Sequence, residues 1–143
     1  MSNPLESGRR AEYRSIAPED YEAVRQFLYE AGWQQRVSDP VRFRLLMENT
    51  DRAVIACDGA RIVGFARALC DGVSNGYISM VAVAVERRRE GIGRELVRRL
   101  IGGDREITWV LRAGRGSGGF WEKVGFKKSD VAMEKVRDSS GNY

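Results

Sequence analysis

The residues best suited to chemistry form one segment, in which an apolar run leads through a glycine-containing turn into a helix. The run 81–85 alternates valine and alanine, and Gly91 and Gly93 then open an amphipathic stretch. The first turn of a helix has free N–H groups and the positive end of the helix dipole, so it binds phosphate. Glycine, which has no side chain, lets an anion approach the backbone closely. The segment therefore predicts a site for a phosphate-bearing ligand.

Three arginines beside this turn strengthen the prediction. Arg88, Arg89 and Arg94 can form charge-assisted hydrogen bonds with a pyrophosphate. A basic helix opening is also typical of a solvated surface, and that simpler interpretation stays open. The segment has neither the G-x-G-x-x-G spacing of dinucleotide-binding proteins nor the Gly-Lys-Ser/Thr of phosphate-loop NTPases. The segment is therefore neither a dinucleotide-binding motif nor the phosphate loop of an NTPase.

The composition excludes several kinds of catalyst. The chain has no histidine, so it contains no Ser-His-Asp or Cys-His nucleophile system and no histidine-ligated zinc. Cys57 and Cys70 are far apart for a metal site, and a reduced, structural role is expected for both. A general base must be a carboxylate, a tyrosine, a lysine or water, and no metal site is expected.

A second motif lies downstream, where residues 120–126 read FWEKVGF. Together with RREGIG at 88–93, it resembles the two signatures of the GNAT acetyltransferase superfamily, Arg/Gln-x-x-Gly-x-Gly/Ala and aromatic-Tyr-Glu-Lys-hydrophobic-Gly-Phe. The two motifs have the family's usual order and separation, with a predicted strand between them. The resemblance covers roughly residues 12–137 and implies an acetyl-CoA-dependent N-acetyltransferase.

The resemblance implies that acetyl-CoA is the co-substrate and that an amine attacks its thioester directly, without an acyl-enzyme. The backbone N–H of Val81 would polarise the carbonyl as a one-donor oxyanion hole, which is typically worth about 3 kcal/mol. The pantetheine arm would pair with the backbone of Val81 and Val83 like an added strand, and the pyrophosphate would lie on the amides of 89–94. The implied cofactor-binding residues are Val81, Ala82, Val83, Arg88, Arg89, Glu90, Gly91, Ile92, Gly93, Arg94 and Trp121.

Trp121 departs from the family pattern, because a tyrosine that protonates the departing thiolate usually stands at this position. An indole N–H donates a hydrogen bond but supplies no proton. A thiol, with a pKa of about 8.5, leaves fairly well without an acid. Trp121 is therefore either a catalytic residue that contacts the sulfur or the pantetheine, or a core aromatic. The asparagine often found ahead of this helix is also absent, since 112–119 is glycine-rich instead.

Tyr77 is the candidate general base. It lies four residues before Val81, where some family members carry a glutamate. Strand alternation predicts that Tyr77, Ser79 and Val81 share one face. A phenol is a poor base at neutral pH, so Tyr77 would more readily order a chain of water molecules, and it can equally be an ordinary strand aromatic.

The candidate acceptor-site residues are Tyr29, Trp33 and Asp71. Tyr29 and Trp33, with Arg36, lie in a predicted loop between the first two helices, a region that roofs the acceptor site in proteins of this family. Both aromatics are equally compatible with the core. Asp71 would supply local acidity. The expected acceptor is a small-molecule or peptide amine.

The elements that position these residues follow from periodicity, caps and turns. The Asp58-Gly59 pair predicts a hairpin, and Asp39 caps a helix that begins at Pro40. Helices are predicted at 18–32, from Pro40 past Met47, at 91–101 and at 117–124. Strands are predicted at 12–16, 53–57, 61–69, 77–85 and 107–111, with a last strand pair formed by 126 and 131–136.

This order of elements predicts an α/β (α+β) fold with a mixed sheet and helices on both faces. The resemblance makes it a GNAT-like, mostly antiparallel central sheet. Acetyl-CoA would then lie in a V-shaped split between the strands at 77–85 and 107–111. The 143 residues fit a single acetyltransferase domain, 1–143, with 1–10 as a flexible tail.

The remaining global features leave two other functions open. One is a CoA-binding sensor of the same fold that has lost the reaction, as Trp121 suggests. The other is a small nucleic-acid-binding domain, suggested by the arginines and a net charge of +4. The chain lacks the aromatic–basic interleaving of such domains, so nucleic acid is not an expected partner. No apolar run spans a bilayer and 1–10 are polar, so a cytoplasmic protein without a membrane partner is expected, and a homodimer is compatible with the sequence.

Overall fold

The computed structural model describes residues 10–138, so all but Arg10 of the expected tail lies outside the described residues. The chain divides after Leu111 into two compact units, each described by itself. The strands of the first unit are β1 Glu12–Ser15, β2 Arg52–Asp58, β3 Arg61–Cys70, β4 Asn75–Val83 and β5 Thr108–Leu111. Its α-helices are α1 Tyr21–Leu28, α2 Gln34–Val37, α3 Pro40–Glu48 and α4 Ile92–Ile101. The second unit contains α5 Gly118–Lys123.

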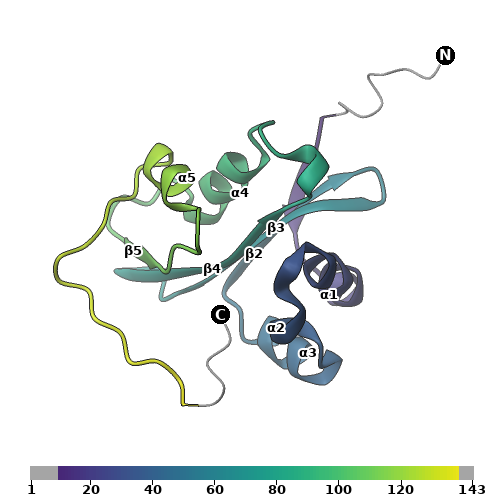
Figure 1. Ribbon diagram of the computed structural model, residues 1–143, viewed down its shortest axis with the longest axis horizontal. Coiled ribbons are helices and arrows are strands. Elements are labelled where there is room, and N and C mark those ends of the chain that lie inside the picture. Colours follow the sequence, from purple (N-terminus) through teal and green to yellow (C-terminus); the bar gives the residue numbers. More distant parts are fainter. Residues whose placement is uncertain (1–9, 139–143) are drawn as a thin grey trace. The chain divides into compact units, whose positions relative to one another are not determined.

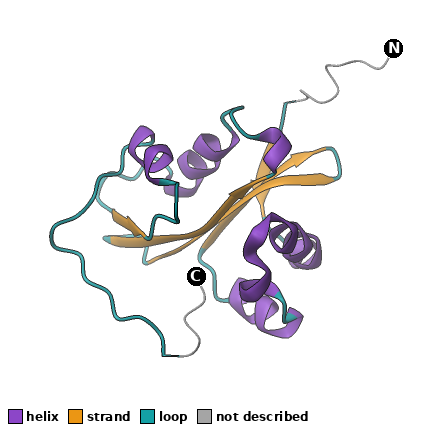
Figure 2. Ribbon diagram, viewed as in Figure 1, coloured by secondary structure: helices purple, strands orange, loops and turns teal. Residues whose placement is uncertain are grey.

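The five strands form one sheet in the order β1-β2-β3-β4-β5, visible as the orange layer in Figure 2. The first four strands are antiparallel to their neighbours, and β4 and β5 run parallel. The hairpin predicted at Asp58-Gly59 is present, since Asp58 pairs with Arg61 and Gly59 adopts a positive φ of 61°. The predicted mixed, mostly antiparallel sheet flanked by helices is therefore confirmed.

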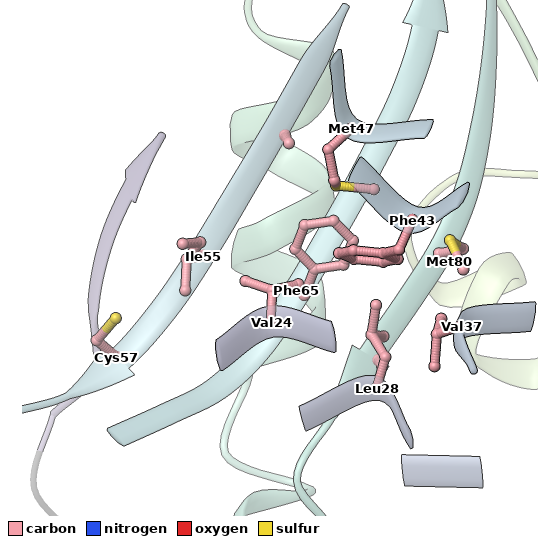
Figure 3. Close-up of a cluster of buried hydrophobic side chains, with 11 residues drawn as sticks. Val24, Leu28, Val37, Phe43, Met47, Ile55, Cys57, Phe65 and Met80 are labelled. Atoms are coloured by element: carbon pink, nitrogen blue, oxygen red, sulfur yellow. The ribbon is translucent and has the colours of Figure 1, made fainter. Parts of the chain in front are cut away.

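Helices cover both faces of this sheet, with α1, α2 and α3 on one face and α4 on the other (Figure 1). On the first face, apolar side chains from α1, α3 and the strands meet in a buried cluster around Phe43 and Phe65 (Figure 3). As predicted, α3 begins at Pro40, where the Asp39 carboxylate accepts hydrogen bonds from the N–H groups of Val41 and Arg42. These contacts hold α1 and α3 against the sheet. The resemblance places the acceptor site beside the segment between the first two helices.

On the opposite face, α4 packs closely against the middle of the sheet because β3 has a glycine there. A side chain on Gly64 would lie 3.0 Å from atoms of Ile92 and Leu96 and 3.2 Å from Ala56. Leu96 and Leu100 of α4 are fully buried. This packing fixes where the N-terminal end of α4, the predicted phosphate site, lies relative to β4.

Two predicted features are wrong. The loop expected between the first two helices is a π-helical turn at Tyr29–Trp33, in which Gly32 takes a φ of 106° and the chain continues directly into α2. The last strand pair is absent from residues 10–138, since 131–136 form no helix or strand. Alternating side chains make a strand only where a neighbouring strand offers hydrogen bonds, and no strand within 10–138 pairs with this segment.

Candidate functional site

Strands β4 and β5 pair over only four residues. The pairs run from Asn75 opposite Thr108 to Ile78 opposite Leu111, where β5 ends. Strand β4 continues to Val83. Within residues 10–138, the backbone of 79–83 therefore has no strand neighbour on the β5 side. Backbone N–H and C=O groups require partners, so this stretch can add an extended ligand as a further strand.

A β-bulge lies at the start of this unpaired stretch. Ser79 pairs with Arg67 and Ala82 with Phe65, so three steps along β4 match two along β3. Met80 adopts a positive φ of 63°, a conformation that costs a non-glycine residue about 1–3 kcal/mol. Bulges of this kind re-aim the backbone and are common next to active sites.

The bulge changes which side chains share a face. Tyr77 and Ser79 lie on the α1–α3 face with Arg67, whereas Val81 and Val83 lie on the α4 face with Gly64. The prediction that Tyr77, Ser79 and Val81 share one face is therefore wrong. Strict alternation fails here because the extra residue in β4 shifts its period by one position. The side chains of the two candidate catalytic residues of β4, Tyr77 and Val81, thus lie on opposite faces of the sheet.

The turn between β4 and α4 presents backbone amides. After a short 3-10 turn at Val85–Arg87, Arg89 takes a φ of 68°, and Gly91 takes a φ of 86° as the N-cap of α4. No side chain in the described part of the chain caps this helix, and its first internal hydrogen bond runs from the N–H of Glu95 to the carbonyl of Gly91 at 3.0 Å. The amides of Ile92, Gly93 and Arg94 thus have no partner within the helix and are available to an anion.

The arginines around this turn divide into two groups. Arg87 is 3% exposed and holds Asp58 and Glu90 at 2.9 Å each, so it ties the turn to the β2–β3 hairpin. The carboxylate of Glu90 is therefore used inside the turn, and only its backbone remains for a ligand. Arg98 and Arg99 pair with Glu95 and lower its pKa to about 2.

The second group consists of the three arginines predicted to bind pyrophosphate. Arg88, Arg89 and Arg94 are exposed, and none forms an ion pair within the described part of the chain. Arg88 makes a long hydrogen bond of 3.4 Å to the carbonyl of Val83. Their charges stand beside the open amides of α4, an arrangement suited to a multiply charged anion.

The candidate acceptor residues near α1 and α2 are helical rather than in a loop. Tyr29 is exposed, while Trp33 is half-buried and packs against the core. The guanidinium carbon of Arg36 lies 5.6 Å from the centre of the Trp33 ring, within the range of a cation–π contact. Trp33 is therefore held at one edge of the α1–α3 face, and Tyr29 presents its ring to solvent.

Asp71 is used by the turn between β3 and β4. Its carboxylate accepts hydrogen bonds from the N–H groups of Val73, Ser74 and Asn75 and from the Ser74 hydroxyl, at 2.7–3.1 Å. The backbone N–H groups are the main reason that its pKa is well below the ordinary value. A carboxylate with this many partners orders the turn, and its predicted contact with the acceptor has no support in these contacts.

In the second unit, Trp121 lies on α5 among aromatic side chains. It is 9% exposed, and its ring makes edge-to-face contacts with Phe120 at 4.9 Å and Phe126 at 5.3 Å between centroids. The N–H of Phe126 donates to the carbonyl of Trp121 at 2.9 Å and closes the turn after the helix. These contacts fit the interpretation of Trp121 as a packing residue, and its catalytic role stays a prediction.

Sequence reasoning missed Arg67, a charged side chain in the interior of the sheet. It is 4% exposed and lies directly opposite Ser79, beside the bulge. The signal was available, because Arg67 is the one charged residue in the apolar run 62–69. Ionised side chains are seldom buried unless they have partners or a function.

Residues 10–138 offer neither a cluster of metal ligands nor a membrane-spanning helix. No group of three or more histidine, cysteine, aspartate or glutamate side chains there could hold a metal ion. None of the helices in that range is long and apolar enough to cross a membrane.

Comparison with known proteins identifies a family. The family model described as an acetyltransferase (GNAT) domain matches residues 49–128, which is more than half of the chain. The match includes β2 to α5 and both motifs that carry the resemblance in the sequence. No curated protein sequence matches the chain.

Solved structures share the fold at low sequence identity. An acetyltransferase from Trypanosoma brucei is 21% identical with a TM-score of 0.69, over 89% of this chain and 99% of that one. A GNAT family protein from Streptococcus pneumoniae is 22% identical with a TM-score of 0.68, over 89% and 96%. Glucosamine-6-phosphate N-acetyltransferase from Arabidopsis thaliana is 16% identical with a TM-score of 0.66, over 91% and 100%.

Proposed function

The chain belongs to the GNAT family of acetyltransferases, and on that premise we propose that it moves an acetyl group from acetyl-CoA to a primary amine. The observation that carries the proposal is the continuous path from the unpaired edge of β4 to the uncapped N-terminus of α4. The path offers strand-like hydrogen-bonding groups first, and then free amides beside Arg88, Arg89 and Arg94. This order matches a ligand with an amide-containing arm that ends in a pyrophosphate.

Acetyl-CoA would bind through the backbone more than through side chains. The backbone of Val81, Ala82 and Val83 would pair with the pantetheine amides, and the amides from Arg89 to Arg94 would hold the pyrophosphate. The bulge at Met80 supports this assignment, because it interrupts the regular ladder where the thioester would lie. The Val81 N–H would then donate to the carbonyl oxygen as negative charge develops on it.

The reaction needs one bond to form and one to break. The amine nitrogen attacks the thioester carbon, the C–S bond breaks as CoA thiolate leaves, and the proton lost by the amine ends on the thiolate or in water. Tyr77 would order water for that proton transfer from the α1–α3 face, which it shares with Ser79. Trp121 supplies no proton.

A CoA-binding protein without turnover is the second candidate. The observation that favours it is Trp121, which stands at the position of the usual acid and packs between Phe120 and Phe126. Nucleic-acid binding has less support, because Arg87, Arg98 and Arg99 of the arginine cluster are paired with carboxylates. We therefore propose a small-molecule or peptide amine as the partner, and neither a nucleic acid nor a membrane.

The cellular setting follows from the same proposal. We propose a cytoplasmic protein, a location that suits its two free cysteines, Cys57 and Cys70. A homodimer is compatible with this proposal, and sedimentation of the purified chain would measure the association.

The test is calorimetric titration with acetyl-CoA, followed by thiol release with a panel of amines, amino acids, aminoglycosides and peptides. We expect binding and acceptor-dependent release of CoA. Binding without release for every acceptor would favour the sensor, and the absence of any heat or melting shift at millimolar acetyl-CoA would overturn both candidates.

A further inference from the structure

Arg67 is buried in the face of the sheet on which an acceptor would bind. It is 4% exposed, pairs with Ser79 across the β3–β4 ladder, and shares that face with Tyr77. Ser79 precedes Val81 by two residues, so Arg67 is level with the place where the thioester carbonyl is proposed to lie. A group that Arg67 holds would therefore approach the proposed thioester from the α1–α3 face.

The guanidinium of Arg67 has unused donors. Its Nε donates to the Thr50 hydroxyl at 2.9 Å, and no carboxylate of residues 10–138 lies within ion-pair distance. A guanidinium carries five N–H donors. The only fully buried side-chain nitrogen or oxygen without a partner in the described chain is Nε1 of Trp109, so the two terminal nitrogens of Arg67 are not sealed from solvent.

The charges around Arg67 leave its positive charge uncompensated. Burial first and then the charge of Arg36 lower the pKa of Arg67, whereas Asp51 and Tyr77 act in the opposite direction and more weakly. The Asp51 carboxylate accepts a hydrogen bond from the N–H of Cys70 at 2.7 Å, so it serves the end of β3. A buried cation with a cationic neighbour and no close carboxylate lowers its free energy by binding an anion.

We propose that Arg67 binds an oxyanion of the acceptor, so that the amine acetylated by this protein carries a carboxylate or a phosphate group. The inference rests on the proposed function. The oxyanion belongs to the acceptor rather than to CoA, because the open amides and Arg88, Arg89 and Arg94 adjoin α4, which packs on the opposite face. The forked guanidinium binds a carboxylate or phosphate through two parallel hydrogen bonds, which fixes the orientation of the amine as well.

The test compares matched acceptors in steady-state kinetics with saturating acetyl-CoA. One pair is an amino acid and its carboxamide, and the other is an amino alcohol phosphate and the free amino alcohol, so the two pairs distinguish a carboxylate from a phosphate. We expect the charged member of at least one pair to have the higher kcat/KM, by about a hundredfold. The Arg67→Met variant should remove this preference mainly through KM, and Arg67→Lys should restore part of it.

Arg52→Met is the matched control, since Arg52 donates to the carbonyls of Leu100 and Ile101 and so ends a helix. It should lower the melting temperature and leave the preference between paired acceptors intact. Equal kcat/KM for both members of each pair, or a preference that survives in Arg67→Met, would overturn the inference while leaving the acetyltransferase proposal standing.

A second readout needs no turnover. Inorganic phosphate and small carboxylates should raise the melting temperature of the wild-type protein more than that of Arg67→Met. If no acceptor is acetylated but this difference is present, the oxyanion site stands and the proposed reaction fails. If wild type and variant respond equally to the anions, the site is refuted.

Discussion

Arg67 and Arg87 are buried to nearly the same extent, at 4% and 3% exposure, but their surroundings differ. Arg87 lies before α4 and forms ion pairs with Asp58 and Glu90. Arg67 lies in the middle of β3 and has one hydroxyl partner, Thr50. Burial alone therefore does not reveal what a charged residue does. The number and charge of its partners separate an arginine that holds the fold from one that is available to a ligand.

The largest expected effect is on stability, and it tests this contrast directly. Arg87→Met leaves two carboxylates without their cation, so the free energy of unfolding should fall by about 3–5 kcal/mol. Arg67→Met removes a charge that has no carboxylate partner, so its stability should change by about 1 kcal/mol or less, or increase. Urea denaturation measures both. Comparable losses in the two variants would show that both arginines are structural.

The next effect concerns the open end of α4, where Arg88, Arg89 and Arg94 lie. Gly93→Glu should weaken acetyl-CoA binding by about a hundredfold or more, because the carboxylate stands where the pyrophosphate would bind. The fold should be kept, since an acidic residue in the first helical turn is favourable and glycine is a poor helix former. Calorimetry and melting curves separate the two properties.

The matched control for this change is Gly103→Glu, beyond the other end of α4, where a side chain would meet nothing within 4 Å. Its affinity for acetyl-CoA should equal that of the wild type. Gly91 is less suitable for the test, because its φ of 86° strains any side chain irrespective of a ligand. Normal binding by Gly93→Glu would place the phosphate site elsewhere.

A smaller effect is expected at Trp121, where the contrast is between packing and catalysis. Trp121→Tyr should preserve or raise turnover, most visibly below the pKa of the thiol, because a phenol can protonate the leaving group. Trp121→Phe should cost little if the residue only packs, and more if its N–H contacts sulfur or substrate. If Trp121 only packs, both variants should alter stability alone, by about 1–3 kcal/mol. The measurement is kcat against pH with melting temperatures alongside.

The smallest effect concerns the ion pair between Arg14 and Asp20 at the surface. Arg14 donates to both carboxylate oxygens of Asp20 at 2.7 and 2.8 Å and lowers the pKa of Asp20. This stabilisation is complete above the pKa of an unfolded aspartate and is lost as the pH falls through the lower, folded value. As the pH is lowered below about 4, the free energy of unfolding should therefore fall less in Asp20→Asn than in the wild type. Parallel stability–pH curves for the two proteins would contradict the assignment.

The sequence by itself determined the features that depend on neighbours along the chain. The Asp58-Gly59 hairpin, the cap at Asp39 and the glycine turn into α4 all appear as predicted, because turn and cap chemistry involves residues only a few positions apart. The two motifs at 88–93 and 120–126 identified the family for the same reason. The absence of histidine limited the available chemistry before any contact was known.

Only the tertiary structure decided the features that depend on pairing between distant segments. The bulge at Met80 placed Val81 on the face opposite Tyr77, because β4 has one residue more than its partner β3 at that point. The alternating segment 131–136 formed no strand, since no neighbour pairs with it. Arg87 and Arg67 differ because the fold adds Asp58 to the carboxylate that Arg87 already has three residues away in Glu90, whereas the side chain of Arg67 meets the Thr50 hydroxyl and no carboxylate among residues 10–138. The contacts with Asp58 and Thr50 join residues far apart in the sequence, so only the fold decides them.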